Sequence, residues 1–282
     1  MLTSTLNKIS SRITFSEKIQ SIISTFFCMI FRLHKGSLWS SVIAKSLSEL
    51  TVTISDKTSF YKFVSSNPLL LWRARTLLTK EEETIHWLNQ ITSKDILFDV
   101  GANIGVYTIF AANKAGKVFS FEPESSNYAT LNKNIHKNNL QNVSSFGIAI
   151  ADKETFDILN LGSICTGAAH HSFGAPLDYK DEAFSPAFKQ GCFSTTLDNL
   201  TGKHGFPIPT YLKIDVDGLE AQIITGAEKL LENRSLKSIL IELNRNLPRD
   251  LELIEKIESK GFKFTLKGES SLGVSNYIFS RQ

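Results

Sequence analysis

The sequence predicts a doubly wound α/β fold, in which helices cover both faces of a mainly parallel sheet. Three observations support this prediction. Short apolar runs alternate with longer runs whose apolar residues recur at helical spacing, from about residue 76 onward. A glycine-containing turn follows the first of the expected buried strands. The composition, with 42% hydrophobic and 21% charged residues, is that of a globular protein with a packed core.

The chain of 282 residues is long enough for one large α/β domain at 76–282 with an N-terminal extension at 1–75. Residues 19–33 carry apolar side chains at helical spacing, but polar interruptions make this run too short for a membrane span. They predict an amphipathic helix that docks on the domain or rests on a membrane surface. Residues 50–64 predict a short pair of strands.

The domain is expected to open with a helix, because Thr79 and Glu82 form a capping-box pattern ahead of apolar residues at helical spacing. Glycines and prolines between residues 151 and 196 predict a hairpin and a surface excursion in place of a crossover helix. Helices are expected at 105–113, 125–138, 219–231 and 251–260. Seven strands are expected, at 96–100, 117–121, 143–150, 211–215 and 238–242, and in a closing antiparallel pair at 262–266 and 277–280.

Charge and cysteine content exclude several classes of protein. The formal net charge is only +3 and the basic residues are scattered, which argues against a nucleic-acid partner. Cys28, Cys165 and Cys192 are too few and too dispersed for a disulfide framework or a zinc site. Because the chain also shows no secretory signal pattern, a cytoplasmic location is expected.

The most informative segment is the strand end and turn from Asp99 to Gly105. Gly101 and Gly105 allow a sharp turn and let a ligand approach the backbone closely. The turn lacks the third glycine of the dinucleotide fingerprint, which favours a ligand without a pyrophosphate, such as S-adenosylmethionine. Asp99 is the candidate partner of the ammonium group of that ligand. Glu122, at the end of the next strand, is the candidate acceptor for its ribose hydroxyls.

The chain resembles the FkbM family of methyltransferases in several segments. These are Asp-Val-Gly-Ala-Asn-Ile-Gly at 99–105, Phe-Glu-Pro at 121–123, Thr-Leu-Asp at 196–198, Leu-Lys-Ile-Asp-Val-Asp-Gly-Leu-Glu at 212–220 and Ile-Glu-Leu at 241–243. One departure is Asp217, where the family more often has glutamate. The resemblance implies a Rossmann-like class I methyltransferase fold and methyl transfer from S-adenosylmethionine, usually to a hydroxyl of a sugar, glycan or secondary metabolite. The expected cofactor-binding residues are Asp99, Gly101, Asn103, Gly105 and Glu122.

Candidate catalytic residues follow from the expected strand order. The strand at 211–215 neighbours the first strand across the topological switch point, so Asp215 is expected close to the transferred methyl group. Methyl transfer requires the acceptor oxygen to be aligned and its proton to be taken. Asp215 is the first candidate for that contact and Lys213 the second, for orientation or charge balance. Glu242 ends the next strand and is a further candidate base or acceptor anchor. His170 and His171, in the expected excursion, titrate near neutral pH and also fit the role of base.

Two interpretations of the acidic residues stay open. Asp217 and Glu220 precede an apolar helical run in the spacing of a capping box, which favours a structural role. Alternatively, Asp215, Asp217 and Glu242 together offer oxygen ligands for a divalent cation. Because capping already accounts for Asp217, we expect no metal.

Two further classes of protein share this fold but fit the sequence less well. The missing third glycine argues against a nicotinamide-dependent oxidoreductase that binds NAD. Retention of the cofactor-binding residues argues against a noncatalytic interaction protein with a Rossmann-like fold. A small-molecule or glycan acceptor is therefore the expected partner.

Overall fold

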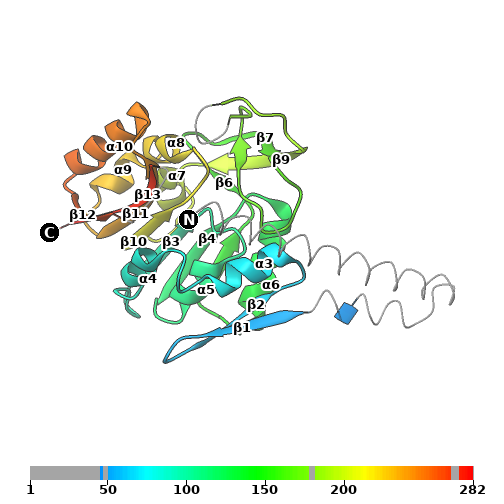
Figure 1. Ribbon diagram of the computed structural model, residues 1–282. Helices are drawn as coiled ribbons and strands as arrows, with labels where there is room; N and C mark the ends of the chain where they lie inside the picture. Colours follow the sequence, from blue (N-terminus) through cyan, green and yellow to red (C-terminus); the bar gives the residue numbers. More distant parts are fainter. Residues whose placement is uncertain (1–44, 47–49, 178–181, 268–272, 282) are drawn as a thin grey trace, which may run out of the picture. The chain divides into compact units, whose positions relative to one another are not determined.

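The computed structural model describes residues 45–46, 50–177, 182–267 and 273–281. The amphipathic helix expected at residues 19–33 lies outside these ranges. Contacts divide the chain into two units, Met1–Leu50 and Thr51–Gln282. All the helices and strands named below belong to the second unit, which begins ahead of the boundary expected at residue 76 (Figure 1).

A seven-stranded sheet forms the centre of this unit, in the order β12-β13-β11-β10-β3-β4-β5 (Figure 1). Its strands are β3 (Ile96–Val100), β4 (Lys117–Phe121), β5 (Val143–Phe146), β10 (Tyr211–Ile214), β11 (Ser238–Asn244), β12 (Lys263–Lys267) and β13 (Val274–Ser280). Strands β5, β4, β3, β10 and β11 run parallel, and β13 is antiparallel to both of its neighbours. The order of strands reverses between β3 and β10. The expected doubly wound, mainly parallel fold is confirmed.

Two apolar cores cover the two faces of the sheet, as alternation along each strand requires. Phe98 lies in one core and its neighbour Leu97 in the other. The first core includes buried residues of the helices after β9, which are α7 (Leu197–Gly202), α8 (Glu220–Thr225), α9 (Glu228–Glu232) and α10 (Pro248–Ser259). The second includes buried residues of α3 (Pro68–Arg75), α4 (Glu82–Leu88) and α5 (Val106–Ala112).

Residues 51–75 pack as part of this unit. The expected strand pair is present as β1 (Thr51–Ser55) and β2 (Phe60–Val64). Tyr61 and Phe63 are fully buried in the second core, together with Leu70 of α3. The backbone amide of Val64 also donates to Asn134 Oδ1 at 2.8 Å, which joins β2 to α6 (Ser125–Lys137). This packing explains why the compact unit begins at Thr51.

A second sheet accounts for much of the region expected to be an excursion. It has four strands, β6 (Ala149–Ile150), β9 (Phe188–Thr195), β7 (Thr155–Leu161) and β8 (His171–Phe173), in that order. The expected hairpin is confirmed as the antiparallel pair of β7 and β8. The single strand expected at 143–150 is wrong, because β5 ends at Phe146 and β6 pairs with β9 in this other sheet.

Two details of the expected helices are also wrong. Helix α4 begins at Glu82 with Glu81 at its N-cap, and no side chain caps it, so Thr79 and Glu82 do not form a capping box. Thr79 lies instead in the turn after α3, where its amide donates to the Thr76 carbonyl. The helix expected at 219–231 is divided at Gly226, where a side chain would collide with the carbonyl of Ala151.

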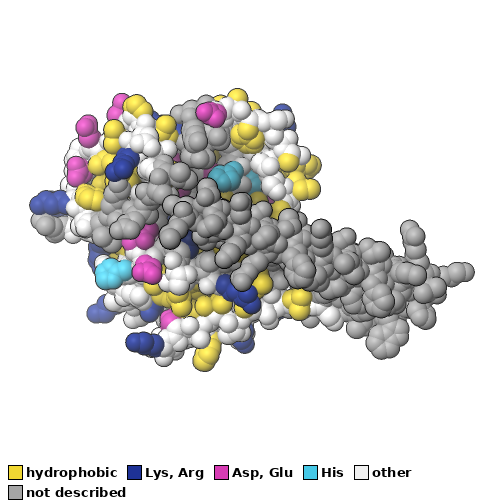
Figure 2. All heavy atoms as spheres, in the orientation of Figure 1, with side chains coloured by type: hydrophobic (Ala, Val, Ile, Leu, Met, Phe, Trp, Pro, Cys, Tyr) yellow, Lys and Arg dark blue, Asp and Glu magenta, His cyan; other side chains and the backbone are white. Residues whose placement is uncertain are grey.

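The charged side chains on one face of the molecule (Figure 2) show no marked segregation. On the face drawn in Figure 2, outside the grey atoms, basic and acidic side chains lie interspersed. None of the helices within the described residues is long and apolar enough to cross a bilayer.

Candidate active site

A cavity of about 730 Å³ lies at the carboxyl ends of the central strands. Residues that follow or end four of these strands line it, namely Gly101 after β3, Glu122 after β4, Asp215 after β10 and Glu242 within β11. The cavity therefore lies at the reversal of strand order, where doubly wound folds bind their ligands. It brings these four together with five others that the sequence singled out, namely Asn103, His170, His171, Asp217 and Glu220.

The glycine turn between β3 and α5 has two different uses for its glycines. Gly101 has a φ of 81°, and a side chain there would collide with the carbonyl oxygen of Asp215, so β10 requires a glycine at this position. Gly105 has a φ of 82°, and its missing side chain would meet Leu131 of α6. Gly101 thus lines the cavity, whereas Gly105 serves the packing of helix against turn.

Glu122 ties this turn to the start of α6. One of its carboxyl oxygens accepts a hydrogen bond from the amide of Asn103 at 2.7 Å, and the other accepts one from the amide of Glu124 at 2.9 Å. Burial raises the pKa of Glu122 to about 7, with further contributions from the charges of Glu124 and Asp217, against the two amide bonds. Its carboxyl group faces the cavity in a position fixed by backbone donors.

Asp99 lies beneath the cavity and is 1% exposed. Thr108 donates to its Oδ2 at 2.5 Å, while its Oδ1 has no hydrogen-bond partner among the described residues and lies 4.0 Å from Lys213 Nζ. Burial raises the pKa of this carboxyl group. Asp99 lines only a side pocket of about 40 Å³, which it shares with Gly101 and Lys213.

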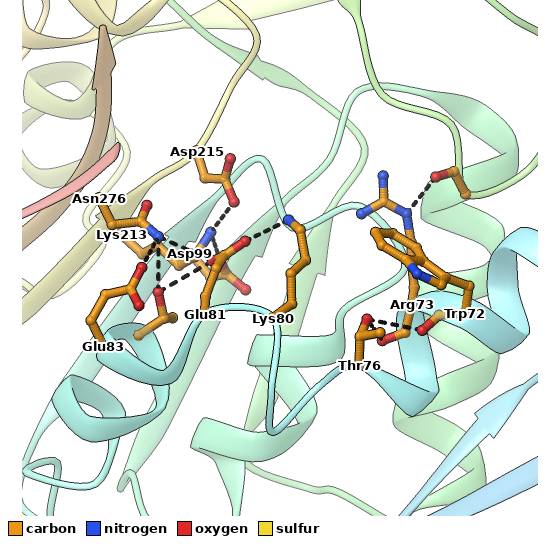
Figure 3. Close-up of polar contacts among 12 residues, drawn as sticks. Trp72, Arg73, Thr76, Lys80, Glu81, Glu83, Asp99, Lys213, Asp215 and Asn276 are labelled. Carbon is orange, nitrogen blue, oxygen red and sulfur yellow. Dashed lines mark hydrogen bonds and ion pairs between the residues drawn. The ribbon is translucent and has the colours of Figure 1, made fainter. Parts of the chain in front are cut away.

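Lys213 and Asp215 form a close ion pair, with 2.7 Å between Nζ and Oδ2 (Figure 3). Burial lowers the pKa of Lys213, but the carboxylates of Asp215 and Asp99 outweigh it and leave the pKa above its ordinary value. Burial likewise opposes ionisation of Asp215, but Lys213 outweighs it and holds the pKa of Asp215 below its usual range. Asp215 is therefore a carboxylate locked by its neighbour.

Glu242 and Glu220 differ from Asp215 in that their pKa values are raised. Both line the cavity, and among the described residues neither side chain accepts a hydrogen bond from another residue. Burial raises the pKa of Glu242 to about 8, aided by the charge of Asp215. Burial also raises the pKa of Glu220 well above its ordinary value, and the charge of Glu242 adds to the effect.

The capping role expected for Asp217 and Glu220 is wrong. Leu219 occupies the N-cap of α8, and no side chain caps that helix. Asp217 instead accepts a hydrogen bond from the amide of His170 at 2.5 Å and lies 3.6 Å from its ring Nδ1. Both ring nitrogens of the neighbouring His171 are buried without a hydrogen-bond partner in the part of the chain that the structure describes, and burial lowers its pKa. Within the described residues, no group of three or more His, Cys, Asp or Glu side chains is placed to hold a metal ion.

The loop before β8 forms one wall of the cavity and is held by amide side chains. Asn103 donates to the carbonyl of Ala168 at 2.9 Å, and Asn127 accepts from the amide of Gly167 at 2.7 Å. Asn103, expected as a cofactor-binding residue, therefore also fixes this loop. Asn127 was not expected in the site, and its place within the polar first turn of α6 gives no distinguishing signal in the sequence.

Three further residues line the cavity from positions on either side of residue 76, where the catalytic domain was expected to begin. They are Trp72, Arg73 and Lys80. No motif marks them in the sequence. Their position follows from the burial of Leu70 and Ala74, which sets the orientation of α3 in the second core.

Comparison of the sequence with protein families identifies a methyltransferase domain. The model of the methyltransferase FkbM domain matches residues 99–264. Among characterised proteins, the hexuronic acid methyltransferase AglP of Haloferax volcanii is 22% identical over 185 residues, which is 64% of this chain and 70% of AglP.

Solved structures similar to this chain include two methyltransferases. The methyltransferase FkbM of Methylobacillus flagellatus is 14% identical with a TM-score of 0.47; the match covers 67% of this chain and 44% of that protein. The precorrin-6y C5,15-methyltransferase of Geobacter metallireducens is 16% identical with a TM-score of 0.43, over 74% of this chain and 93% of that protein.

Proposed function

The chain belongs to the FkbM family of methyltransferases, and from that premise we propose that it transfers a methyl group from S-adenosylmethionine to a hydroxyl group of a sugar. One observation carries the proposal. The carboxyl groups of Glu122 and Glu242, from strands on either side of the switch point, line a single cavity. One carboxyl group is thereby available to the methyl donor and the other to the acceptor.

The glycine-turn side of the cavity is the proposed cofactor site. When bound there, S-adenosylmethionine supplies an electrophilic methyl group. A carboxylate has about four acceptor positions, and Glu122 uses one on each oxygen for backbone amides. It therefore retains acceptor capacity for two ribose hydroxyls. Gly101 and Asn103 form the adjacent wall.

Glu242 is the proposed general base. A base works best when its pKa is close to the working pH, and burial brings the pKa of Glu242 to about 8. Asp215 is less suited to this task, because Lys213 lowers its pKa and occupies one of its oxygens. We assign the pair of Asp215 and Lys213 to orienting the reacting groups, and the proton of the acceptor hydroxyl to Glu242.

A sugar is the favoured acceptor for two reasons. The relative from Haloferax volcanii is described as a hexuronic acid methyltransferase. In addition, Glu220 and Glu242 line the cavity with carboxyl groups that accept no hydrogen bond from another described residue, and sugar hydroxyls supply donors for such groups.

Two measurements test the proposal. Calorimetry with S-adenosylhomocysteine and NAD is expected to show binding of the first alone. Methyl transfer from labelled S-adenosylmethionine is then measured with neutral sugars, uronic acids, phenols and amines, and mass spectrometry locates the new methyl group. Binding of NAD alone would make the cofactor wrong, and methylation confined to nitrogen would make the acceptor group wrong.

A further inference from the structure

Two cationic side chains enter the cavity from a segment that precedes the family match. Arg73 lies in α3 and Lys80 in the turn between α3 and α4. Both line the cavity of about 730 Å³ and also the side pocket of about 40 Å³ beside Gly101. They therefore lie where the two spaces meet.

Arg73 is fixed in place but keeps donors for a ligand. Its Nε donates to the carbonyl of Gly167, which anchors the guanidinium against the loop that walls the cavity (Figure 3). Among the described residues, no carboxylate forms an ion pair with it. A guanidinium has five N–H donors, so the two terminal nitrogens remain able to bind a planar anion.

Lys80 is held beside the cavity by its neighbour. Its Nζ lies 2.5 Å from Glu81 Oε1, and the other oxygen of Glu81 accepts from Thr84 and from Asn276 of β13 (Figure 3). The Lys80 side chain is 45% exposed, whereas that of Glu81 is 10% exposed. An ammonium group has three donors, so Lys80 is able to bind a ligand anion while it keeps its contact with Glu81.

Both cations act on the same end of β10. Lys80 and Arg73 each contribute to the lowered pKa of Asp215, after the larger contribution of Lys213. Asp215 contacts the turn at Gly101, since a side chain on that glycine would meet the Asp215 carbonyl. The two cations and the carboxylates of Asp215 and Glu81 line one narrow space, so this space presents both positive and negative charge to a ligand. Such an arrangement fits the carboxylate and ammonium groups of an amino acid.

We infer that Arg73 and Lys80 form a carboxylate-binding site at the junction of the two spaces. This inference rests on the proposed function, because the favoured source of the carboxylate is the amino-acid part of S-adenosylmethionine. A uronic acid acceptor carries the same chemical group and is the other source. The segment before the family match would then complete the site of the catalytic domain.

Calorimetry with two ligands tests the site. S-Adenosylhomocysteine carries the amino-acid part, whereas 5′-methylthioadenosine has the nucleoside and the thioether without it. Arg73→Gln and Lys80→Met are each expected to lower the affinity for S-adenosylhomocysteine by about 10- to 100-fold, the usual loss for a charge-assisted hydrogen bond. The affinity for methylthioadenosine is expected to stay within about twofold of the wild-type value. Arg75→Gln, on the same helix but exposed, and Lys62→Met, exposed on β2, are matched controls and are expected to bind both ligands like the wild type.

A third ligand distinguishes the two sources of the carboxylate. Suppose that the wild type binds glucuronate and that both variants bind it more weakly, while their affinity for S-adenosylhomocysteine is unchanged. The carboxylate-binding site is then confirmed, and the acceptor supplies the carboxylate. If folded variants, judged by circular dichroism, lose affinity for neither, the site is wrong. If the wild type binds no S-adenosylhomocysteine, the proposed function fails, while the glucuronate measurement still decides for or against the site.

Discussion

The two sides of the cavity differ in how their polar groups are satisfied. On the glycine-turn side, formed by Gly101, Asn103 and Glu122, each polar side chain is bound by backbone groups of the protein. On the carboxyl side, formed by Glu220 and Glu242, the acids accept no hydrogen bond from another described residue, and their pKa values are raised. The acids of the carboxyl side are therefore available to accept hydrogen bonds from a ligand. The glycine-turn side is rigid before any ligand arrives.

The largest effect is expected from a change to the rigid side. Gly101→Ala places a side chain against the Asp215 carbonyl at a φ of 81°, so the turn must move away from β10. S-Adenosylhomocysteine binding, measured by calorimetry, is expected to weaken by at least about 100-fold, and stability to fall by about 1–3 kcal/mol. Gly202→Ala is the control, because a side chain there meets nothing within 4 Å. Unchanged affinity in Gly101→Ala would mean that the turn does not shape the cofactor site.

A change on the carboxyl side is expected to separate chemistry from cofactor binding. Glu242→Gln removes the proposed base but keeps its shape, so turnover is expected to fall by roughly 10² or more while affinity for S-adenosylhomocysteine stays within a few fold. Wild-type turnover is expected to rise as the pH passes through about 8, since the base must be ionised, and this rise is lost in the variant. Glu252→Gln, exposed on α10, is the control.

A contrary result would move the base to the other candidate. If turnover falls by roughly 10² in Asp215→Asn and stays unchanged in Glu242→Gln, Asp215 takes the proton and Glu242 only contacts the acceptor. The pair of Asp215 and Lys213 makes this variant harder to interpret, because it leaves a buried ammonium group with one partner fewer. Its thermal stability must therefore be measured beside its turnover.

The same contrast explains what the sequence alone could predict. Gly101, Asn103 and Glu122 belong to one continuous βαβ unit, so their spacing in the chain already specifies their spacing in the site. The wall from α3 is different. Arg73 and Lys80 reach the cavity because the hairpin and α3 bury apolar residues in the second core, and no local pattern encodes that docking.

The incorrect predictions have a similar origin. Asp217 fits a capping pattern, yet its carboxylate binds the amide of His170, which lies 47 residues earlier in the chain. Ala149 and Ile150 are as apolar as a central strand, yet they pair with Ser194 and Thr195 in the second sheet. In each case a distant partner competes with the local one, and residue type does not distinguish them.

A smaller effect is expected from Glu122, because it is one of several contacts to the cofactor. Glu122→Ala is expected to weaken the binding of S-adenosylhomocysteine by on the order of 1–3 kcal/mol, the usual loss when a charged acceptor disappears. Methylthioadenosine retains the ribose, so its binding is expected to weaken by the same amount. The Arg73 and Lys80 variants, in contrast, are expected to bind methylthioadenosine like the wild type. Equal affinity of wild type and variant for both ligands would remove Glu122 from the site.

The smallest effect is a pH dependence on the glycine-turn side. The pKa of Glu122 is raised to about 7, above its ordinary value of 4.5, so the folded protein holds a proton that the unfolded chain releases. The contribution of Glu122 to stability is therefore present below about 4.5 and is lost as the pH rises through about 7.

Cofactor binding should follow the opposite trend. The ionised carboxylate accepts ribose hydroxyls better than the acid does, so bound ligand lowers the pKa of Glu122 and releases its proton. Affinity for S-adenosylhomocysteine is then expected to rise by up to roughly tenfold from pH 6 to 8, since a carboxyl group with a pKa of about 7 goes from about one tenth to about nine tenths ionised over that range. Calorimetry at pH 6 in buffers of different ionisation enthalpy measures the proton directly, with Glu122→Gln as the control that should release none. If wild type and variant release the same number of protons, the ligand does not meet the carboxylate of Glu122, and the rigid side of the cavity holds the cofactor through its backbone alone.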